Sequence, residues 1–530
     1  MKRHQYAILF LVGLLVPLIV SRFQDLPGYM DADYYFAGGV QLAQGKGFTE
    51  PYIWNYLSDP QTLPNPSHTY WMPLASIVSA VGMWISGLTT YPAGRAPFIL
   101  LSACVPLFVA ALAYKVSHRA RFGFVAGFLS IFSGYYAPFM PVPDNYAIYM
   151  ILGATFLLIA PRGEKWIPLA LGALAGLLTL ARSDGLLWLG LAGLTMVWKS
   201  PLFLKKRRLK IEPEPKPVII RRILFSWVLV VAGYILVAGF WHYRNFTLFD
   251  SFLAPGGGRL LWLENYNQTF IYPSDALTRE GFLQAGWGAA LQNRLTAFQM
   301  NLNNAIAAQG EIFLLPFILL GLREAKINLR VRIAVTGWLI LFAVMTIVFP
   351  FAGWRGSFFH AGAAFQPMWW VAAPMGIDAV LHWLRRRGRF MDRHALPVFL
   401  TAIVVLAAGM TVYLVNLRVV ADGWARDDFI YPKVEQTLQD NGISPNDVVI
   451  VRNPPGYYLA SNRRAVVLPF GDESTILAVA EKFNAKYLIL EKNGTFDAIQ
   501  DLYDEPNGNP SFTYLGEVDG ARLYRIETQN

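Results

Sequence analysis

Two aspartates one residue apart follow the first apolar segment of the chain, and they are the residues best suited to chemistry. The apolar run 6–21 ends near Arg22, and Asp31 and Asp33 follow it, with two tyrosines directly after them. Placing a carboxylate at the depth of membrane hydrocarbon costs about 2.5–3.5 kcal/mol. A pair of carboxylates at a bilayer edge therefore suggests a functional site. The pair could bind a divalent cation, act as a general base, or do both. The alternative is a solvated turn that caps the helix beginning near Tyr34.

The composition places these aspartates in a membrane protein. The chain has 530 residues, of which 55% are hydrophobic and 15% charged, and its mean hydropathy is +0.36. A soluble chain carries about 25% charged residues. Long apolar runs recur from Ala7 to Val415, so we expect a multi-pass protein. The first run lacks a small-residue cleavage pattern, which predicts a retained span. The only cysteine, Cys104, allows no disulfide within the chain.

Hydropathy predicts eleven membrane spans. A twelfth apolar run, Pro73–Thr90, is short, begins with proline and contains two glycines, so we expect it to lie against the outer interface. The predicted spans are 6–21, 95–114, 122–138, 146–160, 167–181, 185–198, 223–243, 305–322, 333–350, 360–381 and 395–417.

Charge sets the predicted orientation. The segments 1–5, 115–121, 161–166, 199–222, 323–332 and 382–394 hold 25 Lys and Arg in 65 residues, which places them on the inner side. Residues 421–530 instead carry 17 Asp and Glu against 10 Lys and Arg. The overall charge of +10 is therefore a signal of topology, and we expect no nucleic-acid partner.

The predicted fold class is an α-helical polytopic membrane protein with about eleven spans and a small C-terminal α/β domain on the outer face. Residues 1–420 form the membrane module, with a first outer loop at 22–94, a basic inner loop at 199–222 and a second outer loop at 244–304. Strand-like and helical runs alternate in residues 421–530, which predicts the α/β domain.

This topology gathers polar residues at one face. Arg355 is flanked by glycines and His360 follows it near the outer start of a span, so both suit an anion site. Asp144 could cap the helix that follows it. The remaining candidates each have a structural alternative, such as an ion pair between Arg182 and Asp184. The outer polar residues are Asp31, Asp33, His68, Asp144, Arg182, Asp184, Arg244, Arg355 and His360.

These motifs, in this order, resemble the GT-C superfamily of polytopic membrane glycosyltransferases. The first outer loop carries Asp-Ala-Asp-Tyr-Tyr at 31–35 and Gly-Lys-Gly-Phe at 45–48, which resemble that group. Asp-Asn at 144–145 resembles the acidic second-loop motif of the oligosaccharyltransferase catalytic subunit. Leu-Ala-Arg-Ser-Asp-Gly-Leu at 180–186 is similar to an element of lipid-linked mannosyltransferases. The resemblance covers most of residues 1–200 in outline.

The resemblance implies an inverting hexosyltransferase in the cytoplasmic membrane that works at the extracytoplasmic face. Its donor would be a polyprenyl-phosphate-linked sugar, as for protein O-mannosyltransferases and lipid A aminoarabinose transferases, and its acceptor a glycan, a lipid or a protein. Asp31 or Asp33 would be the base, with help from Asp144, and these three could hold Mg²⁺ or Mn²⁺. The implied substrate-binding residues are Tyr35, His68, Arg182, Asp184, Arg355 and His360.

Two alternatives remain at this stage. One is transfer to protein, as in oligosaccharyltransferases, but the Trp-Trp-Asp-Tyr-Gly motif of their tail domain is missing here. The nearest aromatic cluster is Pro454–Tyr458, so a single-sugar transferase is favoured. The other is a lipid or solute transporter without chemistry. Transporters tend to show inverted repeats and charges near the bilayer midplane, and the sequence shows neither pattern.

Overall fold

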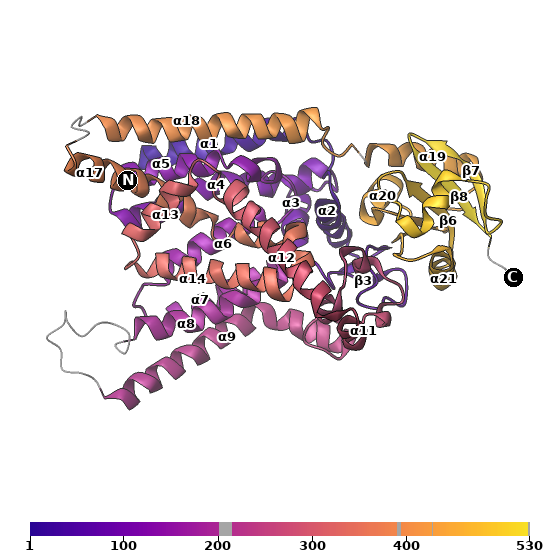
Figure 1. Cartoon of the computed structure of the whole chain (residues 1–530), viewed down its shortest axis with the longest axis horizontal. Helices are drawn as coiled ribbons and strands as arrows, with labels where there is room; N and C mark the ends of the chain where they lie inside the picture. Colours follow the sequence, from indigo (N-terminus) through magenta and orange to yellow (C-terminus); the bar gives the residue numbers. More distant parts are fainter. Residues whose placement is uncertain (201–214, 389–393, 427, 528–530) are drawn as a thin grey trace. The chain divides into compact units, whose positions relative to one another are not determined.

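The computed structural model describes residues 1–200, 215–388, 394–426 and 428–527, and the chain divides into two compact units (Figure 1). The helical unit comprises Met1–Phe23, Ala96–Phe252 and Arg294–Ala421. The sheet unit comprises Gln24–Arg95, Leu253–Asn293 and Asp422–Asn530. Residues 201–214, the centre of the predicted basic loop 199–222, lie outside the described residues.

Five described helices are long and apolar enough to cross a membrane. The longest of them, α9, exposes large side chains such as Phe225 (63%) and Leu236 (75%), a surface that water disfavours and lipid accepts. The chain is thus an integral membrane protein. The five are α1 (Arg3–Ser21), α4 (Tyr91–Ser117), α9 (Lys216–Phe249), α14 (Leu329–Ala343) with its π-helical extension to Val348, and α18 (Ala395–Val415) with its extension to Ala421.

The other six predicted spans fall on helices that do not meet this criterion, so the number of eleven stays a prediction. A break at Gly134, whose φ is +55°, separates α5 from a 3₁₀ turn and shortens that segment. These helices are α5 (Ala120–Ile131), α6 (Tyr146–Ile159), α7 (Ile167–Ala181), α8 (Leu186–Lys199), α13 (Leu315–Glu324) and α17 (Gln366–Arg386). Three further α-helices fall outside these two groups: α12 (Gly286–Asn304), α15 (Pro350–Ala352) and α16 (Phe358–Gly362).

Glycines let helices α13 and α17 approach each other closely. A Cβ on Gly321 of α13 would overlap the carbonyl oxygen of Ala372, and one on Gly376 of α17 would overlap that of Phe317. Small residues at such contacts allow helix backbones to pack directly in a membrane. This pair holds the C-terminal half of α17 in place.

Replacing Gly376 with alanine is therefore expected to destabilise the helical unit by about 1–3 kcal/mol, the usual cost of overpacking. Thermal unfolding in detergent measures the change. Gly409→Ala in α18 is the matched control, because no atom lies near a Cβ built at that position. Equal melting temperatures for the two variants would contradict the close packing of α13 on α17.

The sheet unit is built around six strands in the order β2-β5-β4-β6-β8-β7. The first four pair in parallel, and β8 pairs antiparallel with β6 and β7. The strands are β2 (Tyr52–Ile53), β4 (Val448–Val451), β5 (Ala465–Val467), β6 (Ala485–Glu491), β7 (Phe512–Val518) and β8 (Ala521–Ile526); β1 (Thr49–Glu50) and β3 (Asn65–Pro66) form a separate pair.

Helices cover both faces of this sheet. In β4, Val448 and Ile450 pack with α21, while Val449 and Val451 pack with α19 and α20. The period of two along a strand produces this division, and burial on both faces is typical of parallel strands. The helices of this unit are α2 (Met30–Ala43), α3 (Leu74–Ser86), α10 (Gly256–Arg259), α11 (Arg279–Gln284), α19 (Tyr431–Asp440), α20 (Pro454–Ser461), α21 (Glu473–Phe483) and α22 (Gln500–Asp504).

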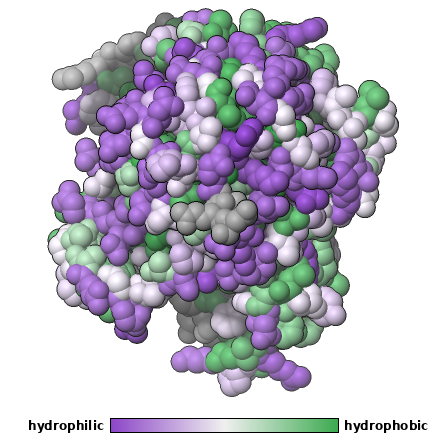
Figure 2. Space-filling view, turned by 90° about the vertical axis from the view of Figure 1, so that its right-hand side faces the viewer, coloured by the Kyte–Doolittle hydropathy of each residue, from purple (hydrophilic) through white to green (hydrophobic). Residues whose placement is uncertain are grey.

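The last segment of the sheet unit begins at Asp422, next to the predicted boundary at residue 421, and the unit also includes Gln24–Arg95 and Leu253–Asn293, which the prediction assigned to the membrane module. Strand β2, in the first outer loop, pairs in parallel with β5 and so becomes an edge of the sheet. Parallel strands pair through backbone groups that are distant in sequence. Because β2 has only two residues, it shows no alternation of apolar and polar side chains from which the pairing could be predicted. The surface drawn in Figure 2 is largely hydrophilic, with scattered hydrophobic side chains.

Candidate functional site

The aspartate pair lies in the first turn of α2, in the sheet unit. Acidic side chains are stabilised there by the positive end of the helix dipole. Asp33 is only 1% exposed, whereas Asp31 is half-buried. The two carboxylates therefore have different environments although they are one residue apart.

Asp33 is held by two residues from the C-terminal segment. Nδ2 of Asn453 donates to Oδ2 of Asp33 at 2.8 Å and to Oδ1 of Asp428 at 2.9 Å. Burial, together with the neighbouring Asp428, raises the pKa of the Asp33 carboxyl well above its ordinary value. Asn453 follows the carboxyl end of β4 and caps α20 by accepting from the N–H of Gly456 at 3.2 Å. The sheet thus positions the amide that positions Asp33.

A pocket of about 390 Å³ lies beside this group and belongs entirely to the sheet unit. Asp428 and Asn453 are among its lining residues, as are the side chains of Arg452, Tyr431 and Glu491. The hydroxyl of Tyr431 donates to Oε1 of Glu491 at 2.8 Å. The pocket lies after the carboxyl end of a central parallel strand, β4, which is the usual place for a ligand in a sheet of this kind.

Two predicted substrate-binding residues, Tyr35 and His68, are buried around Tyr34. The hydroxyl of Tyr34 donates to Glu50 at 2.7 Å and accepts from the N–H of His68 at 2.6 Å. Both ring nitrogens of His68 lie within 2.9 Å of serine hydroxyls, and the ring of Tyr35 meets that of Tyr34 edge-on at 6.0 Å. These contacts favour a structural role for His68 in the first outer loop.

In the helical unit, Asp144 and His360 form a pair. Nε2 of His360 is 3.2 Å from Oδ2 of Asp144, whose side chain is fully buried. Nδ1 of His360 donates to the carbonyl of Gly356 at 3.0 Å, and the ring stacks on Tyr146 at 4.4 Å. A carbonyl oxygen can only accept, so Nδ1 carries a proton toward Gly356, and Nε2 is the ring nitrogen that faces the Asp144 carboxyl. The structure thereby joins two segments that the sequence places at the outer face.

A second buried ion pair adjoins the same helix. Nε of Arg182 lies 2.9 Å from Oδ2 of Asp184, and Tyr149 donates to the other oxygen of Asp184 at 2.7 Å. Tyr149 is one turn after Tyr146, so the first turns of α6 contact both pairs. Arg182 and Asp184 satisfy each other, which is the structural alternative considered above.

Arg355 and Arg244 lie at the ends of helical segments. Arg355 is exposed in the π-helical turn Gly353–Ser357, with its guanidinium 4.7 Å from the ring of Trp354. Gly356, with φ of +133°, allows the sharp change of direction before α16. Arg244 stacks over Trp241 at 4.4 Å near the end of α9.

Sequence reasoning missed two residues that the structure brings to Asp33, and one buried acidic residue of the helical unit. Asp428 and Asn453 are distant from Asp33 in sequence and carry no motif. Glu311 is an acidic residue within the predicted span 305–322, and that was a usable signal. Its side chain is fully buried and accepts from Nε1 of Trp370 at 2.7 Å.

The predicted metal site has limited support in the described residues. They contain no group of three or more His, Cys, Asp and Glu side chains arranged to hold a metal ion. Of the predicted ligands, Asp33 is engaged by Asn453 and Asp144 by His360. Mg²⁺ and Mn²⁺ prefer several oxygen ligands, and a divalent cation at these carboxylates stays a prediction.

No family model and no curated protein matches the sequence, but solved structures share its fold. ArnT from Cupriavidus metallidurans in the apo state matches with a TM-score of 0.56 at 14% identity, over 98% of this chain and 97% of that one. ArnT bound to undecaprenyl phosphate matches at 0.54 and 13%, over 99% and 98%. The Archaeoglobus fulgidus oligosaccharyltransferase in complex with Zn and sulfate matches at 0.52 and 15%, over 97% and 72%.

Proposed function

Because the chain has the fold of the GT-C glycosyltransferases, we propose that it transfers a sugar from a polyprenyl-phosphate-linked donor to an acceptor at the extracytoplasmic face of a membrane. The observation that carries this proposal is the buried Asp33, held between an amide and a second carboxyl in a shared fold. The undecaprenyl phosphate of the ArnT complex is a lipid of the proposed carrier class. We also propose that the transferred sugar is a hexose and that the enzyme is similar to mannosyltransferases.

In this reaction Asp33 is the general base. A base works best when its pKa approaches the operating pH, and burial beside Asp428 moves the pKa of Asp33 in that direction. The carboxylate takes the proton of the acceptor hydroxyl or amide as that group attacks C1 of the sugar. The C1–O bond to the phosphate breaks, and the configuration at C1 inverts. Asp31 remains the second candidate base.

The helical unit supplies positive charge for the departing phosphate. The imidazolium of His360, whose cationic form the Asp144 carboxylate stabilises, and the guanidinium of Arg355 are the groups that we assign to this task. A charge-assisted hydrogen bond to a phosphate oxygen is about twice as strong as a neutral one, and it stabilises the negative charge that develops as C1–O breaks. We assign no step to a metal ion.

The pocket beside Asp428 is our candidate for the acceptor. Its planar polar side chains, Arg452, Asn453 and Glu491, together with Tyr431, suit hydroxyl groups. A hydroxyl acceptor on a glycan or a lipid is therefore favoured over a protein amide. Transfer to protein is retained as the alternative because the oligosaccharyltransferase shares the fold.

Release of the lipid phosphate tests the proposal directly. The purified protein is incubated with a panel of polyprenyl-phosphate sugars and with membrane glycolipids as acceptors, and released polyprenyl phosphate is measured. We expect release from one donor class, and its loss in Asp33→Asn. Transport of lipid without breakage of any sugar–phosphate bond would instead establish the transporter.

A further inference from the structure

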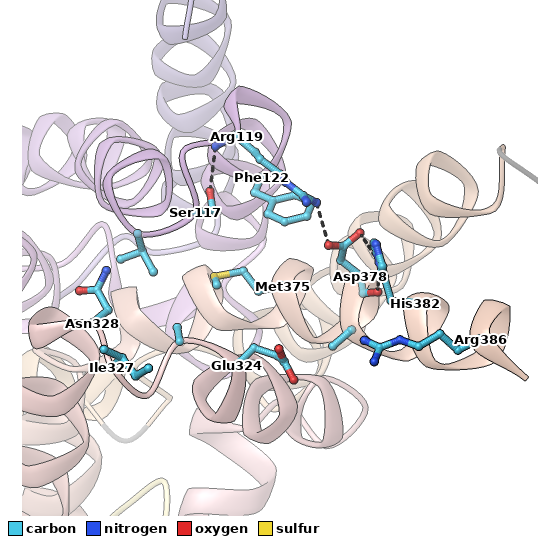
Figure 3. A pocket seen from close by; sticks show the side chains of 13 residues that line it. Ser117, Arg119, Phe122, Glu324, Ile327, Asn328, Met375, Asp378, His382 and Arg386 are labelled. Atoms are coloured by element: carbon cyan, nitrogen blue, oxygen red, sulfur yellow. Dashed lines mark hydrogen bonds and ion pairs between the residues drawn. The ribbon is translucent and has the colours of Figure 1, made fainter. Parts of the chain in front are cut away.

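A large pocket of the helical unit, about 550 Å³, has no place in the proposed reaction. It is formed by the end of α4, the start of α5, the turn between α13 and α14, and the C-terminal half of α17. A volume of this size accommodates a small ligand. Figure 3 shows charged side chains and a histidine from three of these places around one space: Arg119, Glu324, Asp378, His382 and Arg386.

The pocket lies at the level where membrane-crossing helices end. Ser117 is the last residue of α4 and Asn328 caps the start of α14, and both helices are long and apolar enough to span. Both residues line the pocket. The ends of two spans mark the boundary between hydrocarbon and headgroups. Most of the lining residues come from three segments that the sequence predicts on the inner side, 115–121, 323–332 and 382–394, and the others come from the adjoining helix ends.

Charges of both signs surround this space. Nη1 of Arg119 is 2.7 Å from Oδ2 of Asp378, and Nδ1 of His382 is 3.5 Å from the other oxygen of that carboxylate. Within the described residues, the side chains of Glu324 and Arg386 have neither an ion pair nor a hydrogen bond, although both line the pocket. An uncompensated anion and an uncompensated cation therefore face the same space.

We propose that this pocket binds the headgroup of a zwitterionic phospholipid, with the phosphate toward Arg386 and Arg119 and the ammonium toward Glu324. A ligand that carries only negative charge would be repelled by Glu324, whose charge no neighbouring cation among the described residues offsets. A ligand with both charges satisfies both free side chains. The lipid tails would continue along the apolar helices that end here. This site is independent of the proposed transfer reaction.

Native mass spectrometry of the purified full chain tests the site. The detergent-solubilised protein is incubated with phosphatidylethanolamine or phosphatidylglycerol, and retained lipid is counted. We expect one retained phosphatidylethanolamine, bound about tenfold more tightly than phosphatidylglycerol, which is a difference of about 1.4 kcal/mol. Arg386→Gln should weaken the binding of both lipids, whereas Glu324→Gln should remove only the preference for phosphatidylethanolamine. Free phosphoethanolamine should compete weakly, because it lacks the tails.

Arg162→Ala is the control, because Arg162 is an exposed arginine predicted on the same side and paired with Glu164. It should retain lipid like the wild type. The proposal is overturned if phosphatidylglycerol is preferred, if neither pocket variant changes retention, or if Arg162→Ala changes it as much as Arg386→Gln. The three substituted residues are all exposed, and thermal melting of each variant verifies that it folds.

Discussion

Replacing Asp33 with asparagine is expected to abolish sugar transfer and, at the same time, to stabilise the protein at neutral pH. The loss of activity follows from the loss of the base, which contributes about 10²–10⁴-fold to such a reaction. The gain in stability follows from burial. An asparagine amide can donate to Asp428 and accept from Asn453, so it fits between the same partners without a buried charge.

The stabilisation by Asp33→Asn should depend on pH, and the raised pKa of Asp33 sets its direction. An unfolded aspartate titrates near pH 3.9, and the folded Asp33 has a raised pKa. Between these two values the folded protein binds more protons than the unfolded chain, so the free energy of unfolding falls as the pH rises. Each pKa unit corresponds to about 1.4 kcal/mol. Asparagine does not titrate. The difference in free energy of unfolding between Asp33→Asn and the wild type should therefore increase from pH 4 upward and then level off.

Paired measurements of thermal unfolding and of released polyprenyl phosphate, both against pH, examine this prediction. Asp497→Asn is the matched control, since Asp497 is an exposed carboxylate of the same unit. It should change neither quantity. Asp31→Asn separates the two candidate bases: if it alone abolishes transfer while Asp33→Asn remains active, the assignment of the base to Asp33 is wrong.

The sequence was informative where a pattern repeats along the chain. Long apolar runs predicted α1, α4, α9, α14 and α18, because a span of this length has few alternatives. Residues 421–530, where strand-like and helical runs alternate in the sequence, contain β4 to β8, because alternation and β-branched residues favour strands. Short or broken helices such as α5 do not show their limits in composition, so the count of spans could not be derived in the same way.

The partners of the candidate site were not predictable by such patterns. Asp33 could be recognised by its type and place, but Asp428 and Asn453 are brought to it by the sheet, whose edge strand β2 is two residues long. A single asparagine after a strand usually means only a helix cap, and Asn453 is also that. Pairing between distant segments depends on tertiary packing, which leaves no local period in the sequence.

The second large effect is expected at Asp144 and His360, where each substitution should raise the KM for the lipid-phosphate donor about tenfold. A hydrogen bond to a charged group contributes about 1.5–3 kcal/mol, and each tenfold change corresponds to about 1.4 kcal/mol. Asp144→Asn keeps an oxygen to accept from the N–H of Asn145, which now lies 2.6 Å from Oδ1. Its amide, however, can donate to Nε2 of His360 and so favours the neutral ring.

A double-mutant cycle distinguishes this coupling from two separate structural effects. If His360 binds the phosphate only because Asp144 keeps it protonated, then Asp144→Asn with His360→Gln should lose little more than either single variant. His4→Gln, an exposed histidine of α1, should leave the KM unchanged. Additive losses in the cycle, or a fall in kcat with no change in the donor KM, would show that the pair acts on the fold or on the acceptor and not on the leaving phosphate.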